Sequence, residues 1–319
     1  MSYFLFGHRP NAEVLRVKLQ QLRYFVAVYE EGSITAGAER AFATQQGLSM
    51  QIKDLEERFD AVLFERAAKG VHPTEMGRRF YKYATKILKE VAEAEQGMKA
   101  MRGVITGHVN VGLMPTFTRS IFPSAMLAFG EQYPLVDLSV VEAYSAKLIK
   151  DVLQGSLDFA IVPGKADDLP AGLRGRAVGK DSEFLVSRWS DDGAHLKPVS
   201  LQNYKKLKLI LPSTKNVRRT RLDAFLKQNK IEVSAKLELD AMMGTLKLVS
   251  QSDWRTIQTG ALLTSDRHEG RFCINPLVDA PEVDYVLIEA TSRRLSQGAQ
   301  LFADCLQQEY ERQVPADGG

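Results

Sequence analysis

The chain has 319 residues, enough for two or three domains rather than one small one. It is 45% hydrophobic and 25% charged, which supports folded cores and excludes a disordered chain. The formal net charge of +3 is too small to indicate nucleic-acid binding by itself. The sequence has neither a run of 18 apolar residues nor a secretion signal in its first 17 residues, so we expect a cytoplasmic protein with no membrane partner.

The first predicted element is a helix from about Leu19 to Glu31. Residues 1–17 precede it and are expected to be a tag, a segment read from an upstream start codon, or an ordinary short arm. Apolar residues recur in the helix at helical spacing, which predicts one buried face: Leu19, Leu22, Phe25, Val26 and Tyr29.

Two further helices are predicted in close succession, from Ile34 to Phe42 and from Gln45 to Phe59. Ser33 and Thr44 stand directly before them, where a hydroxyl oxygen accepts from an N–H in the first helical turn. So little chain separates the two helices that they must cross at a large angle. This arrangement is typical of a helix-turn-helix.

The second of these helices is expected to bury Leu48, Ile52 and Leu55, together with Ala38 and Ala41 of the first. Amide and hydroxyl side chains then point outward near its start, where they suit base edges in a DNA major groove. We therefore predict a DNA-binding surface made of the two helix starts and this face: Ser33, Thr44, Gln45, Gln46, Ser49, Met50 and Lys53.

A two-stranded wing is predicted next, over residues 62–66 and 69–72, and Thr74-Glu75-Met76-Gly77 then opens a long helix. This succession resembles the N-terminal signature of the LysR-type transcriptional regulators. The resemblance covers residues 18 to about 312 and rests on these segments: Leu22-Arg23-Tyr24-Phe25, Glu31-Gly32-Ser33, Gln45, Leu48-Ser49, Leu55-Glu56, Leu63-Phe64-Glu65-Arg66 and Thr74-Glu75-Met76-Gly77.

The chain departs from the family pattern on the predicted DNA-reading helix. Gln46 stands where the family usually has Pro, Gly47 where it usually has Ala, and Met50 where it often has Arg. These departures affect the expected base preference rather than the fold. From the wing, we expect Arg66, Lys69 and His72 to contact phosphates, although Arg66 has the alternative of pairing with Glu65 or Asp60.

The long helix, residues 74–102, carries apolar residues in alternating steps of four and three: Phe80, Ala84, Ile87, Val91, Ala94, Met98 and Met101. That rhythm is typical of helix pairing. The resemblance implies a linker that dimerises. Residues 18–72 also carry only seven Lys or Arg against eight Asp or Glu, so DNA binding needs several such modules acting together. We expect a homodimer or homotetramer.

Residues 103–319 alternate between strand and helix patterns, which predicts an α/β domain with parallel, doubly wound sheets. The predicted strands cover 108–114, 136–143, 159–162, 207–211, 232–238 and 283–288, and the last is expected to return to the first set. The predicted helices cover 115–133, 146–154, 216–228, 242–250 and 296–313. The resemblance implies a periplasmic-binding-protein-like effector domain of two lobes, so the chain is a multi-domain α/β protein.

Ligands of such sheets bind beyond the carboxyl ends of strands, at helix N-termini, where N–H groups and the helix dipole favour anions. The loops Pro115–Arg119, Tyr144–Ala146 and Pro212–Asn216 satisfy this rule. We predict a small organic or inorganic anion, most simply a carboxylate, bound by Thr116, Thr118, Arg119, Ser145, Ser213, Thr214 and Asn216. Trp254, near the hinge, is expected to pack rather than bind.

The sequence shows no catalytic, cofactor or metal motif: its five histidines are scattered, and Cys273 and Cys305 have no ligand spacing. We therefore predict a transcription regulator and not an enzyme. Two alternatives remain open. One is a small-molecule-binding protein or enzyme on the same scaffold, and the other is a redox sensor that uses the two cysteines.

Overall fold

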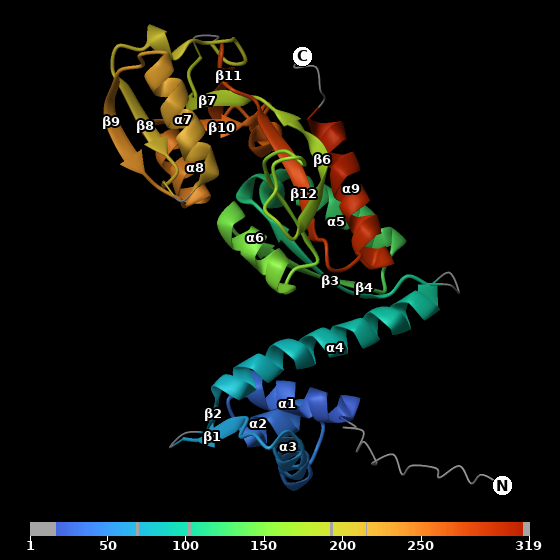
Figure 1. Ribbon diagram of the computed structural model, residues 1–319. Helices are drawn as coiled ribbons and strands as arrows, with labels where there is room; N and C mark the ends of the chain where they lie inside the picture. The colour runs from blue at the N-terminus through green and yellow to red at the C-terminus, as the bar shows by residue number, and fades with distance from the viewer. Residues whose placement is uncertain (1–16, 68–69, 101–103, 192–193, 215, 315–319) are drawn as a thin grey trace, which may run out of the picture. The chain divides into compact units, whose positions relative to one another are not determined.

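The computed structural model describes residues 17–67, 70–100, 104–191, 194–214 and 216–314 (Figure 1). The chain folds into two compact units, Met1–Glu95 and Gln96–Gly319, which are taken in turn. Residues 1–16, Lys69, Met101 and Lys215, which entered the predictions above, lie outside the described residues.

The first unit contains the predicted helix-turn-helix and wing. Its elements are α1 (Leu19–Glu31), α2 (Ile34–Arg40), α3 (Gln45–Phe59), β1 (Phe64–Arg66), β2 (Val71–Pro73) and the start of α4 (Glu75–Ala100). Ser33 Oγ accepts from the N–H of Ala36 at 3.3 Å, and Thr44 Oγ1 accepts from that of Gly47 at 3.2 Å. Both hydroxyls therefore cap a helix as predicted.

A glycine allows α2 to approach α1 closely. A Cβ on Gly37 would stand 3.0 Å from the backbone N of Val28, closer than van der Waals contact allows. The core beneath the two helices is closed by α3, whose Leu48 and Leu55 are fully buried. Glu56 fixes the wing to α3, because its Oε1 accepts from the N–H groups of Leu63 at 2.7 Å and Phe64 at 3.1 Å.

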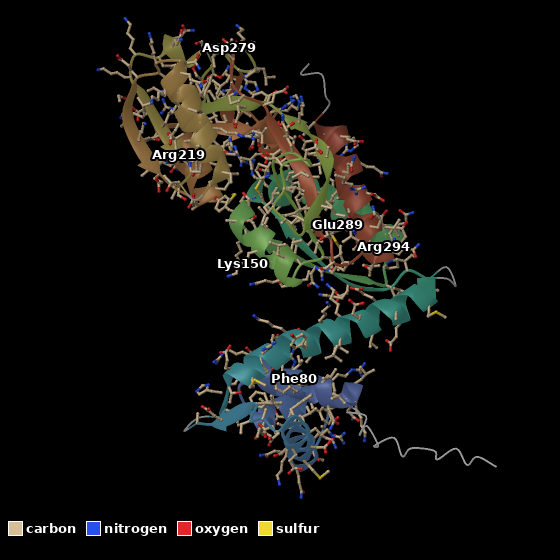
Figure 2. The ribbon with its side chains drawn as sticks, in the orientation of Figure 1. Phe80, Lys150, Arg219, Asp279, Glu289 and Arg294 are labelled. Carbon is tan, nitrogen blue, oxygen red and sulfur yellow. The ribbon has the colours of Figure 1, made fainter. Side chains whose placement is uncertain are left out.

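The start of the linker helix α4 belongs to this core. Phe80, labelled in Figure 2, meets Phe25 at 4.7 Å and Phe59 at 5.1 Å between ring centroids. Ala84 is fully buried against the same cluster. The prediction that Ala84 forms part of a dimer seam is therefore wrong, because its side chain is already covered within one chain, whereas Phe80 is only partly buried. Ile87 and Met98 are 45% and 66% exposed, so the outer part of the stripe stays available to a partner.

The second unit has two lobes, each built on a five-stranded sheet. In the first lobe the strand order is β4-β3-β5-β12-β6. Its strands are β3 (Gly107–Leu113), β4 (Val136–Glu142), β5 (Phe159–Pro163), β6 (Leu173–Asp181) and β12 (Val283–Ala290). The π-helical turn η1 (Phe117–Ile121) runs into α5 (Phe122–Gln132), and α6 (Ser145–Gln154) and α9 (Gln297–Gln313) complete the lobe.

The second lobe has the strand order β11-β7-β10-β8-β9. Its strands are β7 (Glu183–Arg188), β8 (Leu207–Leu211), β9 (Val233–Glu238), β10 (Arg255–Thr259) and β11 (Phe272–Pro276). Its helices are η2 (Leu201–Asn203), α7 (Val217–Gln228), α8 (Met242–Gln251) and η3 (Gly260–Asp266). Trp254 packs against the apolar cluster of this lobe, as predicted.

The sequence predicted parallel sheets, but both sheets are mixed. Strands β3, β4 and β5 are parallel, but β12 runs antiparallel to both β5 and β6. In the second lobe β7 is likewise antiparallel to β10 and β11. The reason is that β6 continues into β7, and β11 into β12, so these strands carry the chain between the lobes without a helical crossover. The return of β12 to the first sheet is confirmed.

Candidate functional site

The predicted DNA-reading face of α3 is open to solvent. Gln45, Gln46, Ser49, Met50 and Lys53 are all exposed, while Leu48, Ile52 and Leu55 of the same helix are buried. Among the described residues, Lys53 forms one ion pair, an exposed contact of 3.4 Å to Glu57, which is weak enough to let it turn toward a phosphate. The cap hydroxyls of Ser33 and Thr44 accept backbone N–H groups and retain a proton that they can donate.

The wing places Arg66 and His72 on successive residue pairs of its two strands. Glu65 pairs with His72 across the two strands, and Arg66 pairs with Val71. His72 is exposed. The side chain of Arg66 lies outside the described part of the structure, as does the whole of Lys69, so their phosphate contacts stay predictions.

A pocket lies where the two lobes of the second unit meet. It is formed at the carboxyl ends of parallel strands: Met114, Pro115 and Thr116 follow β3, Tyr144 follows β4, Pro212 and Asn216 follow β8, and Leu239 and Asp240 follow β9. This is the position that the topology rule predicts. The cavity measures about 30 Å³, space for one or two water molecules in the lobe arrangement described here.

Two of the predicted effector residues, Thr116 and Asn216, line this pocket. Asn216 Oδ1 caps α7 by accepting from the N–H of Arg218 at 3.0 Å. Ser145 is buried at the first turn of α6, and Thr214 is exposed. Neither belongs to the pocket lining, and nor does Ser213, whose backbone N–H donates to Asp240 Oδ1 at 2.8 Å.

Thr118 and Arg119 have other partners. The hydroxyl of Thr118 donates to the Glu142 carboxylate. The Arg119 guanidinium forms an ion pair with Asp266, at 2.5 Å for Nη1–Oδ2 and 2.9 Å for Nη2–Oδ1. Neither residue belongs to the pocket lining. The structure therefore gives Arg119 a role in joining the lobes in place of the predicted ligand contact.

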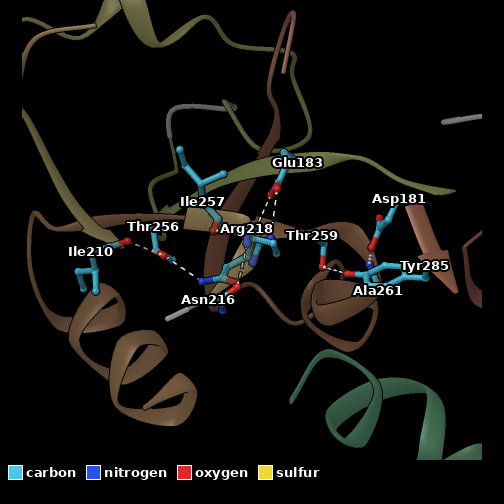
Figure 3. Close-up of polar contacts among 11 residues, drawn as sticks. Asp181, Glu183, Ile210, Asn216, Arg218, Thr256, Ile257, Thr259, Ala261 and Tyr285 are labelled. Atoms are coloured by element: carbon cyan, nitrogen blue, oxygen red, sulfur yellow. Dashed lines mark hydrogen bonds and ion pairs between the residues drawn. The ribbon is translucent and has the colours of Figure 1, made fainter. Parts of the chain in front are cut away.

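The pocket wall also carries the cation of Arg218, which the sequence analysis did not select. Its Nη2 lies 2.6 Å from Glu183 Oε2, and its Nε lies 3.3 Å from Oε1 (Figure 3). Burial by itself would lower the pKa of Arg218, but the facing Glu183 carboxylate makes the net shift upward. The guanidinium therefore stays charged. No described residue bonds to its Nη1.

A chain of polar side chains continues the wall along β10. Gln258 Nε2 donates to Thr256 Oγ1 at 2.9 Å. The Thr256 hydroxyl in turn donates to the Ile210 carbonyl at 3.0 Å (Figure 3). Gln258 Oε1 is buried and has no hydrogen-bond partner among the described residues. A buried acceptor without a partner costs free energy, so this atom is suited to a ligand donor.

Beside the pocket, the crossing between the lobes holds a buried acid. Asp181 Oδ2 accepts from the N–H of Ala261 at 2.9 Å, and Tyr285 donates to Thr259 Oγ1 at 3.2 Å (Figure 3). Burial raises the pKa of Asp181 to about 6, with a smaller contribution from the Glu183 carboxylate. The N–H of Ala261 acts in the opposite direction.

One signal in the sequence points to Arg218. A cation in the first turn of a helix opposes the helix dipole, and Arg218 stands two residues after the cap of α7. Such a placement needs a compensating anion or a ligand. Gln258 gave no such signal, because β10 itself has no clear strand pattern.

The structure offers little for metal or thiol chemistry. Among the described residues, no group of three His, Cys, Asp or Glu is placed to hold a metal. Cys273 lies in β11 of the second lobe and Cys305 in α9 of the first. Burial, followed by Glu309, raises the pKa of the Cys305 thiol, which disfavours the reactive thiolate. None of the helices within the described ranges has both the length and the apolar character that spanning a membrane requires.

A winged helix-turn-helix together with a ligand pocket between two lobes defines a ligand-controlled DNA-binding regulator. Residues 19–78 match the family model of the bacterial regulatory helix-turn-helix protein of the lysR family. Residues 102–311 match that of the LysR substrate binding domain. The chain belongs to the LysR family of transcriptional regulators. It is a transcription regulator with a DNA-binding helix-turn-helix domain and a substrate-binding domain.

Curated relatives include regulators of several processes. A probable RuBisCO transcriptional regulator of Phaeodactylum tricornutum is 30% identical over 220 residues, which are 69% of this chain and 72% of the relative. The regulator CfxR of Cupriavidus necator is 33% identical over 153 residues, 48% of each chain. The nitrogen assimilation regulatory protein nac of Escherichia coli is 26% identical over 227 residues, 71% of this chain and 73% of the relative.

Solved structures show the same fold over nearly the whole chain. A full-length OxyR variant from Pseudomonas aeruginosa has a TM-score of 0.68 at 17% identity and covers 95% of this chain and 99% of its own. Full-length CbnR in complex with its target DNA has a TM-score of 0.64 at 19% identity and covers 93% of this chain and 100% of its own. At these identities the likeness concerns the fold alone.

Proposed function

We propose that the pocket between the lobes is the effector site and that its ligand is a small carboxylate that also carries a hydroxyl or amine donor. The observation that carries the proposal is Arg218, a buried cation on the pocket wall with one nitrogen bonded to no described residue. An anion completes the hydrogen bonding of that nitrogen. Asn216 and Thr116 add neutral donors at two helix starts, where the dipole also favours negative charge.

The second half of the proposal concerns the ligand's own donor. Gln258 Oε1 lacks a partner among the described residues, and Asp240 also lines the pocket. Both are acceptors, so a bare anion such as sulfate satisfies neither. A carboxylate with a neighbouring hydroxyl or amine satisfies the donors and the acceptors together.

Binding of such a ligand requires the lobes to separate or shift, because the present cavity of about 30 Å³ holds no more than one or two waters. A ligand that binds one lobe arrangement better than another changes the population of the two. We propose that this shift is how the effector reaches the DNA-binding modules of the oligomer.

On the DNA side, we propose that Gln45, Gln46 and Ser49 read bases, with Met50 and Lys53 beside them. Arg66, Lys69 and His72 hold phosphates from the wing. The proposed domains are residues 18–73 for DNA binding, 74–102 for the linker and 103–319 for the effector. We further propose that the protein has no catalytic activity and works in the cytoplasm, beside its DNA.

The test is thermal unfolding of the full-length protein with malate, lactate, glycerate and serine, each compared with the corresponding carboxamide. We expect at least one free acid to raise the unfolding temperature where its amide does not. Thr116→Val keeps the side-chain shape and removes one donor. It should weaken binding of that acid by about 1–3 kcal/mol.

Thr118→Val is the matched control, because the Thr118 hydroxyl is bonded to Glu142 outside the pocket lining. Its affinity for the acid should equal that of the wild type. Equal losses in the two variants, or stabilisation by an amide as strong as by its acid, would contradict the proposed site.

A further inference from the structure

Phe42, in the turn between α2 and α3, is a large apolar residue with an entirely open side chain. Its exposed fraction is 100%, whereas its neighbours Ala41 and Ala43 pack against the core of the domain. Burial within this unit therefore gives no reason for an aromatic ring at this position. Single exposed apolar residues are common, so exposure alone is not an argument.

The backbone of Phe42 supplies an independent observation. Its φ is +51°, in the left-handed region. The N–H of Phe42 donates to the Glu39 carbonyl at 3.1 Å, and that of Ala43 donates to the Ala38 carbonyl at 2.9 Å. These two bonds define a Schellman ending of α2 in which Phe42 holds the left-handed position, normally a glycine. A Cβ there carries a steric penalty that glycine avoids.

Phe42 is thus unfavourable for the isolated domain in two ways, through a strained backbone and an exposed ring. A partner that contacts the ring accounts for both. DNA is that partner by position, because the turn leads directly into the exposed start of α3, where Gln45 and Gln46 follow. In a helix-turn-helix, the second helix enters the groove by its N-terminal residues while the first crosses the phosphate backbone.

We propose that Phe42 is a specificity-determining residue of this regulator and that its ring packs on the C5 methyl of a thymine in the operator. The thymine methyl is the apolar group that base edges present in the major groove, and phenylalanine is among the side chains that contact it. The contact extends the proposed base-reading face from the start of α3 into the turn that precedes it.

The experiment uses the full-length protein and duplexes that the wild type enriches from a random-sequence library. Phe42→Gly removes the ring and relieves the left-handed strain, Phe42→Asn tolerates the same backbone, and Phe42→Tyr keeps the ring. We expect Gly and Asn variants to bind the enriched duplex at least about fivefold more weakly, as for loss of one base contact, and Tyr to bind like wild type. The unfolding temperature of Phe42→Gly should equal or exceed that of wild type.

Replacing each thymine of the enriched duplex by deoxyuridine removes one methyl at a time. One position should weaken wild-type binding about fivefold and leave the Phe42→Gly variant unaffected, because the two changes remove the same contact. Binding of Phe42→Gly to an unselected duplex should match that of wild type.

Three results overturn the proposal. The first is wild-type affinity of Phe42→Gly for the enriched duplex, and the second is an equal loss on the unselected duplex. The third is a lower unfolding temperature or an altered sedimentation coefficient for Phe42→Gly, which would place the ring in a protein contact.

Discussion

Arg119 and Asp266 form a bidentate ion pair that links the first lobe to η3, the helical segment that follows β10. Asp266 is 1% exposed and Arg119 18%, and Nη1 of Arg119 also donates to the Leu262 carbonyl at 2.6 Å. The segment that carries Asp266 joins the two lobes, because its Ala261 packs in the first-lobe core and its Leu262 in the second-lobe core. The pair therefore fixes the position of one lobe on the other.

Arg119→Ala should destabilise the effector domain by about 3 kcal/mol, because it leaves the Asp266 carboxylate buried without a partner. Urea unfolding followed by tryptophan fluorescence measures this, since both tryptophans, Trp189 and Trp254, lie in the second lobe. The double variant Arg119→Ala/Asp266→Ala should lose less than the sum of the single losses. Additive losses would mean that the two side chains do not interact.

The Asp181 carboxyl should make the free energy of unfolding fall as the pH rises from about 4 to about 6. Its pKa is raised from 3.8 to about 6 in the folded chain, so between these values the folded state holds a proton that the unfolded state has released. The associated stability is fully present below pH 3.8 and is lost by the time the pH exceeds about 6. The shift corresponds to about 3 kcal/mol.

Asp181→Asn removes this titration and keeps an oxygen that can accept from the N–H of Ala261. The variant should therefore gain stability relative to wild type as the pH rises from about 4 to about 6, and little more above that range. Urea unfolding at several pH values measures the difference. A variant whose stability parallels that of wild type across this range would show that Asp181 titrates normally.

Gln45→Ala and Gln46→Ala should each cost about 1–3 kcal/mol on the enriched duplex and little on an unselected one, because amides read base edges. Arg66→Ala is the contrasting variant. It should weaken binding to both duplexes and reduce the slope of log K against log salt by about one. Fluorescence anisotropy at several salt concentrations separates the two patterns. Equal losses of the glutamine variants on both duplexes would remove them from base readout.

Ile87→Glu tests the outer part of the linker stripe, since Ile87 is 45% exposed in the single chain. If a partner helix covers Ile87, the variant buries an unpaired carboxylate. It should then sediment as a smaller oligomer than wild type in sedimentation velocity. Lys86→Glu, an exposed neighbour off the stripe, should sediment like wild type. An unchanged Ile87→Glu variant would place the dimer contacts elsewhere.

The helices were the part of the fold that could be predicted, because their start residues and periodicity are local properties. Thr44 caps α3, and its range, Gln45–Phe59, was predicted to the residue. Strands β6, β7, β10 and β11 were missed. Buried polar residues interrupt β10, which carries Thr256, Gln258 and Thr259, so the apolar pattern of a core strand is absent. For the site, the rule that ligands bind beyond the carboxyl ends of parallel strands selected three loops, and each of them contributes to the pocket lining.

What the sequence determined by itself was therefore the class of fold, the exposed polar face of α3 and the loops around the pocket between the lobes. Capping and helical periodicity act over short stretches of chain, and they can be read without coordinates. Tertiary structure alone decided which polar side chains face the pocket. Arg119 and Arg218 have the same chemistry at two helix starts, but Asp266 binds the first at the lobe junction, while Glu183 holds the second at the pocket wall. Those partners lie 147 and 35 residues away, and only folding brings them together.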